Sequence, residues 1–366
     1  MSNTLYEAKN HLDIVIKKVR IHFYKPIQIA EILRIHRENL SFDLNDLESY
    51  RNSSKKWRDQ ISQRIVGNIC TSSARFQDNL FEINAMPPRL IAALGEENEK
   101  SDRAGIVEAY IHNCIGLRID ILKRIESYIA NASPDRFDFA EFLNNFRSTP
   151  GLKRSIDKAY EITVYALFST LARYLNATIT VRVPKDNMAL LREFEDFTRT
   201  VLGITADRSE IVIPARLYRA GVANAADRGI DMWTNFGPAV QIKHLSLTED
   251  AAEDIVSQIS ADRIVVVCLT AEKTAIERIL SQLGFSDRIQ GIATQDDLER
   301  WYSKCFSEKH RDTLGISLLK DLHREFISEF PSVGDEFSNF MMERGYTRIQ
   351  MVGIFSNLDS ISRGGY

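Results

Sequence analysis

The spacing of apolar residues changes near residue 150, and this change limits what the chain can fold into more than any other feature. Before it, apolar side chains recur at helical intervals and strand-like alternation is scarce. After it, short β-branched runs alternate with helix-like segments. The sequence Arg-Ser-Thr-Pro-Gly at 147–151 favours a break in secondary structure between the two patterns. We therefore expect an α-helical domain over residues 1–150, followed by mixed α/β structure.

The second half of the chain is expected to alternate helices and strands. Apolar spacing predicts helices at 152–175, 188–201 and 251–259. Runs of β-branched and apolar residues predict strands at 177–183, 211–213, 229–233, 239–245, 263–269 and 289–293. Thr294, which two aspartates follow closely, is expected to cap the N-terminus of a further helix. We expect a core over 151–305 and a mainly helical extension over 306–366 packed on that core, with a short strand at 349–354.

Composition restricts the class of protein. With 366 residues, of which 44% are apolar and 27% charged, the chain is expected to form two to three globular domains. No apolar run approaches the ~18 residues of a membrane span, and no basic and apolar leader pattern is found, so we expect a cytoplasmic protein without a membrane partner. The four cysteines form no CxxC pair, which argues against a zinc site. The net charge of −3 argues against a uniformly basic nucleic-acid-binding surface, although local patches remain possible.

A polar trio interrupts two apolar strands in the segment 227–245. The sequence Asn-Phe-Gly-Pro at 235–238 favours a turn and predicts a hairpin between the two strands. Alternate residues of a strand share a face, so Gln241 and Lys243 are expected to point the same way. Asp231, on the neighbouring strand, is expected to lie opposite them. A carboxylate, an amide oxygen and an ammonium would then surround one point.

These three groups suit metal-assisted hydrolysis of a phosphodiester. Asp231 would offer Mg²⁺ an anionic oxygen, and Gln241 would offer a neutral one. Lys243 would position or help deprotonate the attacking water and would offset negative charge in the transition state. The spacing alone occurs by chance in many chains, and a structural ion pair is the alternative interpretation. The catalytic interpretation is favoured because an unpaired charge is costly among apolar strand residues.

The order of these elements resembles the PD-(D/E)XK nuclease superfamily: a helix, a strand, a strand with Asp231, a strand with Gln241-x-Lys243, a helix and an apolar strand. The hairpin is similar to the Mrr-like branch, in which glutamine can occupy the second acidic position. The superfamily resemblance covers about residues 151–303 and implies a restriction-endonuclease-like α/β core. A closer resemblance, to the HaeII-type restriction endonucleases, rests on the hairpin and on the segments Tyr24–Glu31, Lys158–Glu161 and Pro214–Gly221.

The resemblance implies further site residues. Glu161 matches the acidic residue on the helix before the first core strand, which can hold a second metal ion or a metal-bound water. Glu195 is the competing helix acid, because Mrr-like enzymes place one just upstream of the aspartate strand. Gln241 removes one negative charge from the usual site, and Asp227 is a candidate to compensate for it. His244 is expected to pack on the other side of its strand.

A basic segment at 51–75 is the first candidate for DNA contact. It contains six basic residues and one acidic residue, a local balance of +5. Lys55, Lys56 and Arg58 would bind phosphates there. The alternative is a solvated helix with a basic face.

A loop just before the hairpin is the second candidate for DNA contact. It carries Arg216, Arg219, Asn224 and Arg228. Arginine pairs with guanine and asparagine with adenine in the major groove, so this loop could read bases. Alternatively, its first two arginines could pair with nearby Asp207 or Glu210.

The residues and the resemblance together predict a Mg²⁺-dependent type II restriction endonuclease that cuts double-stranded DNA. The resemblance implies a short palindrome with a GCGC centre. Cleavage of both strands predicts a homodimer, and restriction predicts a separate cognate DNA methyltransferase. The N-terminal domain would then serve target recognition or dimerisation. The alternatives are a Mrr-like or repair nuclease acting on modified or branched DNA, and a non-catalytic DNA-binding protein with a decayed nuclease core.

Overall fold

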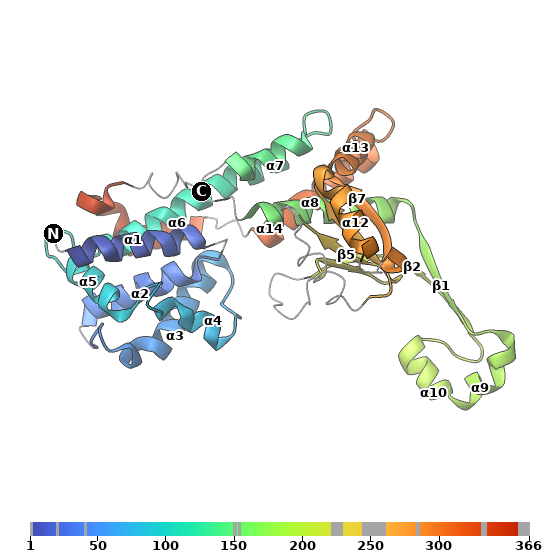
Figure 1. The fold of residues 1–366 in the computed structure, drawn as a ribbon, viewed down its shortest axis with the longest axis horizontal. Helices are drawn as coiled ribbons and strands as arrows, with labels where there is room; N and C mark the ends of the chain where they lie inside the picture. Colours follow the sequence, from blue (N-terminus) through green and yellow to red (C-terminus); the bar gives the residue numbers. More distant parts are fainter. Residues whose placement is uncertain are drawn as a thin grey trace. The chain divides into compact units, whose positions relative to one another are not determined.

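The computed structural model describes residues 3–19, 22–39, 42–148, 152, 155–220, 230–243, 261–282, 286–330 and 335–357. The chain divides into two compact units (Figure 1). Unit 1 comprises Met1–Ala132, Arg136–Tyr160 and His323–Tyr366, and unit 2 comprises Ser133–Asp135 and Glu161–Leu322. The fold is mixed α/β and mostly helical, with two small sheets, as the sequence predicts. Within the described ranges, no helix is long and apolar enough to cross a membrane.

Unit 1 is helical because its apolar residues recur at helical spacing. On the first helix, for example, Leu5, Ala8 and Leu12 share one face and are all buried. The helices are α1 (Asn3–Lys18), α2 (Tyr24–Asn39), α3 (Leu47–Val66), α4 (Ala74–Asp78), α5 (Pro88–Asn98), α6 (Ile106–Ala130), α7 (Phe139–Ser148) and, near the end of the chain, α15 (Asp335–Glu343). The expected N-terminal helical region is confirmed.

The last part of the chain contributes to the hydrophobic core of unit 1. Phe337, Phe340, Tyr346 and Phe355 are buried in the same cluster as side chains of α1, α2 and α6. We had expected the whole of 306–366 to pack on the α/β core. The contacts instead group the chain from His323 onward with unit 1, because the aromatic side chains of this tail are buried there.

The prediction of a strand at 349–354 is wrong. The structure has 3₁₀ turns at Tyr346–Arg348 and Gly353–Phe355 instead. Gly353 has φ 59°, in the left-handed region, and a strand cannot continue through that conformation. Burial of the two flanking aromatic rings, Tyr346 and Phe355, therefore decides the local conformation.

Unit 2 contains a five-stranded mixed sheet with the order β3-β4-β5-β6-β7. The pairs β3–β4 and β4–β5 are antiparallel, whereas β5–β6 and β6–β7 are parallel. The strands are β3 (Leu217–Arg219), β4 (Met232–Thr234), β5 (Ala239–Ile242), β6 (Ile264–Cys268) and β7 (Ile289–Thr294). All but β3 lie within or overlap the strands expected from the sequence, whereas the expected helix at 251–259 lies outside the described residues.

Helices flank this sheet in the chain. α8 (Ile156–Tyr174) precedes residues 177–215 and β3, and α12 (Lys273–Gln282) connects the parallel strands β6 and β7. α13 (Gln295–Cys305) and α14 (Ile316–Glu329) follow. The side chains of Ile264 and Val266 on β6 are buried against Ile276 and Ile279 of α12, which explains why this strand is apolar at nearly every position.

The β4–β5 hairpin turns at 235–238, as predicted. Gly237 has φ 117°, which residues with a side chain rarely adopt. Asn235 ties the turn to the preceding chain: its Oδ1 accepts from the N–H of Arg216 at 2.8 Å, and its Nδ2 donates to the carbonyl of Pro214 at 2.9 Å. The turn thereby holds the two strands that carry the polar trio.

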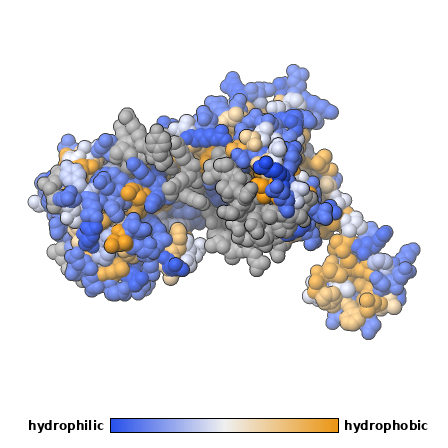
Figure 2. Space-filling model, in the orientation of Figure 1, coloured by the Kyte–Doolittle hydropathy of each residue, from blue (hydrophilic) through white to orange (hydrophobic). Residues whose placement is uncertain are grey.

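Residues 177–215, here called the arm, form a separate element of unit 2. β1 (Thr178–Arg182) pairs with β2 (Glu210–Pro214) in an antiparallel two-stranded sheet. Between them lie α9 (Met188–Glu193), α10 (Glu195–Phe197) and a π-helical turn at Thr198–Leu202, where one continuous helix was expected. Both strands were expected, but they pair only with each other and do not join the larger sheet. Figure 2 shows apolar surface gathered over the arm.

Candidate active site

Asp231 and Gln241 are brought together by the β4–β5 hairpin, as expected. Asp231 immediately precedes β4, and its main-chain N–H donates to the carbonyl of Val240 at 3.2 Å. The side-chain Nε2 of Gln241 donates to Asp231 Oδ2 at 2.8 Å. The main-chain N–H of Ile242 donates to the same oxygen at 2.7 Å. The carboxylate is thus held against the adjacent strand by two donors.

The other amide atom of Gln241 is chemically informative. Gln241 is only 3% exposed, and its Oε1 accepts no hydrogen bond within the part of the chain that the structure describes. A buried acceptor without a partner costs free energy, so an occupant that supplies a positive charge or a donor is favoured there. A hard cation held by the oxygens of Asp231 and Gln241 meets this requirement.

The oxygen donors of Asp231 and Gln241 are ones that Mg²⁺ can accept. Among the described residues, no group of three His, Cys, Asp or Glu side chains gathers as a metal site. Mg²⁺ keeps several waters and needs only one or two protein carboxylates. One carboxylate and one amide oxygen are therefore compatible with Mg²⁺.

Lys243 lies two residues beyond Gln241, just after the end of β5. Its main-chain N–H donates to the carbonyl of Val267 on β6 at 2.8 Å, so the backbone is anchored while the side chain is half-buried. Two-residue spacing in extended chain puts it on the face of Gln241.

Glu161 lies on α8 and forms a buried ion pair with Arg219 of β3. Their side chains are 5% and 8% exposed, and Arg219 Nη1 lies 3.4 Å from Glu161 Oε1. Arg219 is the register partner of Met232, the residue after Asp231. The pair therefore connects α8 to the strand next to the Asp231 strand. Sequence reasoning missed this partnership, because nothing in local spacing relates positions 161 and 219.

This ion pair corrects the expectation that Arg219 belongs to a DNA-reading loop. Residues 217–219 form β3, and the Arg219 guanidinium is buried against Glu161 instead of facing solvent or pairing with Asp207 or Glu210. Arg216 is exposed and remains a candidate for DNA contact. Asn224 and Arg228, like Asp227 and His244, lie outside the described residues.

Glu195, the competing helix acid, lies on α10 in the arm. Its carboxylate pairs with Arg199 at 2.6 Å. It is carried by the segment between β1 and β2, which form their own sheet, whereas Glu161 contacts a strand of the five-stranded sheet itself. This difference favours Glu161 over Glu195.

A stacked aromatic pair on the five-stranded sheet was not anticipated. Tyr218 and Trp233 are register partners on β3 and β4, and their rings stack with centroids 4.2 Å apart. Trp233 is 48% exposed, and its strand directly follows Asp231. Trp233 stands between Met232 and Thr234, which are both buried. This alternation was the sequence signal from which its exposed ring could have been predicted.

The basic segment on α3 is largely neutralised by ion pairs. Lys55 Nζ lies 2.7 Å from Asp78, a residue outside the 51–75 count. Arg58 is 2% exposed and donates to Gln28, Asp59 and Gln77, so the expectation that it binds phosphates is not supported. Lys56 is exposed and remains a candidate for DNA contact. A count of charges along the chain could not reveal partners supplied by other helices.

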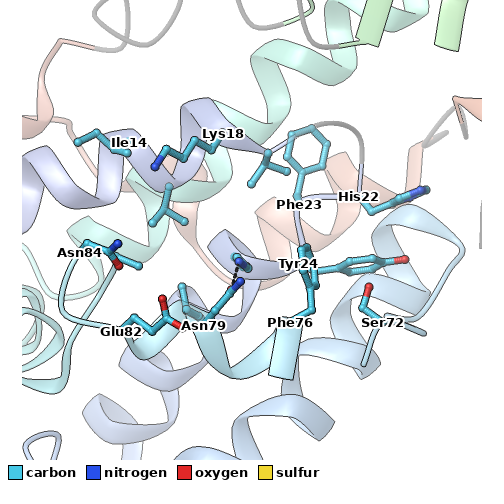
Figure 3. Close-up of a pocket in the computed structure, with 15 residues that line it drawn as sticks. Ile14, Lys18, His22, Phe23, Tyr24, Ser72, Phe76, Asn79, Glu82 and Asn84 are labelled. Carbon is cyan, nitrogen blue, oxygen red and sulfur yellow. Dashed lines mark hydrogen bonds between the residues drawn. The ribbon is translucent and has the colours of Figure 1, made fainter. Parts of the chain in front are cut away.

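Unit 1 also contains a cavity of about 710 Å³ (Figure 3). Lys18, His22, Tyr24 and Phe76 are among its lining residues, and Lys25 lies 4.7 Å from the centre of the Phe76 ring. Burial lowers the pKa of His22 and also that of Lys25. None of the predicted site residues lines this cavity.

The mixed sheet and the hydrogen-bonded Asp231–Gln241 pair define a protein of the restriction-endonuclease-like α/β class. The family model for the HaeII restriction endonuclease matches residues 8–346. The chain belongs to this family, and it is a type II restriction endonuclease.

Two relatives support this assignment along nearly the whole chain. The type II restriction enzyme NgoBI of Neisseria gonorrhoeae is 49% identical over 343 residues, covering 93% of this chain and 96% of that protein. The type II restriction enzyme HaeII of Haemophilus aegyptius is 47% identical over 347 residues, covering 94% and 98% respectively. No solved structure matches the chain. The resemblance to the HaeII-type restriction endonucleases is confirmed.

Proposed function

We propose that this protein hydrolyses double-stranded DNA in a Mg²⁺-dependent reaction at a PD-(D/E)XK site. Asp231, Gln241 and Lys243 form that site, and Glu161 is its helix acid. The observation that carries the proposal is the buried Gln241 Oε1, for which the described part of the chain supplies no hydrogen-bond donor, beside the fixed carboxylate of Asp231. Membership of a restriction endonuclease family supports the same reaction.

Each side chain has a distinct task. Asp231 and Gln241 would hold the ion, with the N–H of Ile242 keeping the carboxylate in place. When bound, Mg²⁺ would act as a Lewis acid on the scissile phosphate. The Lys243 ammonium would orient the attacking water and offset the charge that develops on the phosphate oxygens. Glu161, held by Arg219, would contribute a second carboxylate from α8.

The target and its partners extend this proposal. We propose a palindrome with a GCGC centre, cut by a homodimer that brings one active site to each strand. Lys55, Lys56, Arg216, Asn224 and Arg228 remain candidates for DNA contact. A separate DNA methyltransferase would protect the host DNA, and both proteins would act in the cytoplasm.

Two other functions are weighed against this one. A Mrr-like or repair nuclease would cut modified or branched DNA, and a decayed nuclease would bind DNA without cutting. Similarity to two type II restriction enzymes over more than 90% of the chain supports restriction. The Gln241 amide replaces the usual carboxylate, which would be a sign of a decayed nuclease. Its Oε1 is nevertheless available to a cation, because it has no donor among the described residues.

The test is digestion of a long unmodified DNA with purified protein and Mg²⁺, followed by sequencing of the fragment ends. We expect discrete fragments whose ends all come from sites with a GCGC centre. Lys243→Ala should cut at least about 100-fold more slowly while site-specific binding stays nearly intact, because it removes only transition-state stabilisation. Asp231→Asn should lose metal-dependent cutting.

Lys304→Ala is the matched control, because Lys304 is an exposed lysine on α13. It should cut like the wild type. A fully active Lys243→Ala enzyme would rule out the catalytic assignment. Cutting confined to modified or branched DNA would favour the repair function, and binding without cutting would favour a decayed nuclease.

A further inference from the structure

The arm exposes far more apolar surface than its share of the chain. Of 21 large apolar side chains that are exposed among the described residues, eight lie within residues 177–215. They are Val181, Leu190, Phe194, Phe197, Val201, Leu202, Val212 and Ile213. Apolar patches of this kind on a soluble protein mark interaction sites.

The helical part of the arm carries four of these side chains. Leu190, Phe194, Phe197 and Val201 are between 49% and 61% exposed, and they come from α9, from the break after it, from α10 and from the π-helical turn. A hollow of about 490 Å³, lined in part by Leu190, Phe194 and Phe197, lies in the same segment.

The ribbon of the arm also has an apolar face. The register pairs Ile179 with Ile213 and Val181 with Ile211, and paired residues share a face. Val181 and Ile213 are each 37% exposed. Because a two-stranded ribbon is only marginally stable alone in water, cover over this face would stabilise it.

The charge of the arm argues against DNA as the molecule that covers it. Residues 177–215 contain five basic and six acidic side chains, for a net charge of −1. Surfaces that bind DNA are strongly positive. Glu195 and Arg199 also pair with each other at 2.6 Å, so that arginine is occupied within the arm.

We propose that the arm is the homodimerisation element, which packs against the arm of a second copy of this chain. Without Val212, which lies on the opposite face of the ribbon, the exposed apolar side chains are 37% to 61% exposed and leave on the order of 600 Å² of surface. A stable interface takes ~800 Å² from each partner, so these side chains would supply most of it. A patch that meets its own copy forms the self-complementary contact that two-fold symmetry requires. This inference rests on the proposed function, since a palindrome cut on both strands needs two active sites.

The test measures the mass of the full chain by sedimentation equilibrium without DNA or Mg²⁺. The wild type is expected at twice its 41.8 kDa chain mass, and Leu190→Glu/Phe197→Glu at the single mass. Ile83→Glu/Met342→Glu is the matched control, because these side chains are 82% and 58% exposed in unit 1. It should remain dimeric. Circular dichroism melts check that each variant is folded.

Leu190→Ala provides a milder second variant that adds no charge. It should weaken the dimer about tenfold, the effect of truncating a central apolar contact. A monomeric wild type, or a Leu190→Glu/Phe197→Glu variant that stays dimeric, would overturn the proposal. An arm variant that stays dimeric but loses salt-dependent DNA affinity would assign the arm to DNA instead. Because mass is measured without cleavage, failure of the proposed chemistry would leave this result unaffected.

Discussion

The side-chain amide of Gln241 stabilises the Asp231 carboxylate at the sheet without a metal ion. Its Nε2 and the N–H of Ile242 both donate to Asp231 Oδ2, at 2.8 and 2.7 Å. Hydrogen bonds to an ionised acceptor are among the stronger ones in proteins. A glutamate at position 241 would instead place a second carboxylate at hydrogen-bonding distance from the Asp231 carboxylate.

We therefore expect Gln241→Glu to lower thermal stability without divalent metal and to increase the stabilisation by Mg²⁺. Loss of the hydrogen bond and repulsion between the carboxylates should cost about 1–3 kcal/mol. The added anionic ligand should bind the cation more tightly, and binding to the folded state raises stability. Melting temperatures measured with and without Mg²⁺ check both effects.

The exposed Gln60 of α3 provides the control, and Gln60→Glu should melt like the wild type in both conditions. If Gln241→Glu gained no more from Mg²⁺ than the wild type gains, the amide oxygen would not face the metal.

At the scale of single elements, α13 begins where its sequence predicts. Thr294 Oγ1 accepts from the N–H of Asp297, and Asp297 Oδ2 accepts from the N–H of Thr294 at 2.9 Å, so the two form a capping box. Thr294 also ends β7 and is only 5% exposed. The direct step from strand to helix thus depends on one side chain.

Thr294→Ala should lower the free energy of unfolding by about 1 kcal/mol, because the first turn of α13 loses its cap. Thr294→Ser keeps the hydroxyl and should recover most of that loss. Denaturant unfolding followed by circular dichroism measures both variants. Equal stability of Thr294→Ala and the wild type would show that the cap contributes nothing.

The stability that this capping box contributes depends on pH, because the Asp297 carboxyl titrates. The N–H of Thr294 holds the pKa of this carboxyl below its usual value of 3.8. A lowered carboxyl pKa stabilises the fold above the unfolded-state value, and this contribution is lost as pH falls through the folded-state value. The hydroxyl of Thr294 also lowers this pKa, and Thr294→Ala removes that bond while it keeps the N–H. The part of the stability difference that comes from the bond between hydroxyl and carboxylate should therefore be present at neutral pH and shrink below about pH 4.

At the scale of the whole molecule, the tail completes the core of unit 1 through a polar network. Glu108 of α6 is fully buried and accepts from Arg37 at 2.8 Å and from the hydroxyl of Tyr346 at 2.9 Å. His112, one turn later, stacks on the Tyr346 ring with centroids 5.1 Å apart. Its Nδ1 lies 2.9 Å from the carbonyl of Glu108. Residues more than 200 positions apart are thus joined around one buried carboxylate.

This packing predicts a pH dependence of stability. Burial lowers the pKa of His112 from 6.5 to about 4. Below pH 6.5 the unfolded chain binds a proton at this site that the folded chain does not, so stability falls as pH drops from 6.5 towards 4 and is fully present above 6.5. The total loss is ~3 kcal/mol.

His112→Phe should remove that part of the pH slope, because the ring is kept and the titrating nitrogen is lost. Guanidinium unfolding at several pH values between 4 and 7.5 measures the slope. A variant with the wild-type slope would assign the pH dependence to another group.

The strands β4 to β7 and the hairpin were predictable because they depend on local patterns. Runs of β-branched and apolar residues predicted these strands, and turn-forming residues predicted the bend at 235–238. The neighbouring positions of Asp231 and Gln241 followed from that hairpin. Their roles in catalysis stay a prediction.

Contacts between distant segments were not predictable in the same way. Arg219 was expected in a DNA-reading loop, but it is buried with Glu161, 58 positions away in the chain. Arg58 was counted as a surface charge, but it is buried among Gln28, Asp59 and Gln77. Local charge counts fail here because a buried charge must be paired or hydrogen-bonded. Other elements supply Glu161 to Arg219, and Gln28 and Gln77 to Arg58.

The sequence by itself determined the division into helical and α/β parts, the hairpin with its polar trio and the family. These depend on periodicity, turn chemistry and motif residues that lie close together in the chain. Only the tertiary structure decided which charges are buried in pairs, that the tail joins the core of unit 1, and that β1 and β2 form an arm of their own. Those outcomes depend on which surfaces are buried against each other, and burial is a property of the folded chain in three dimensions.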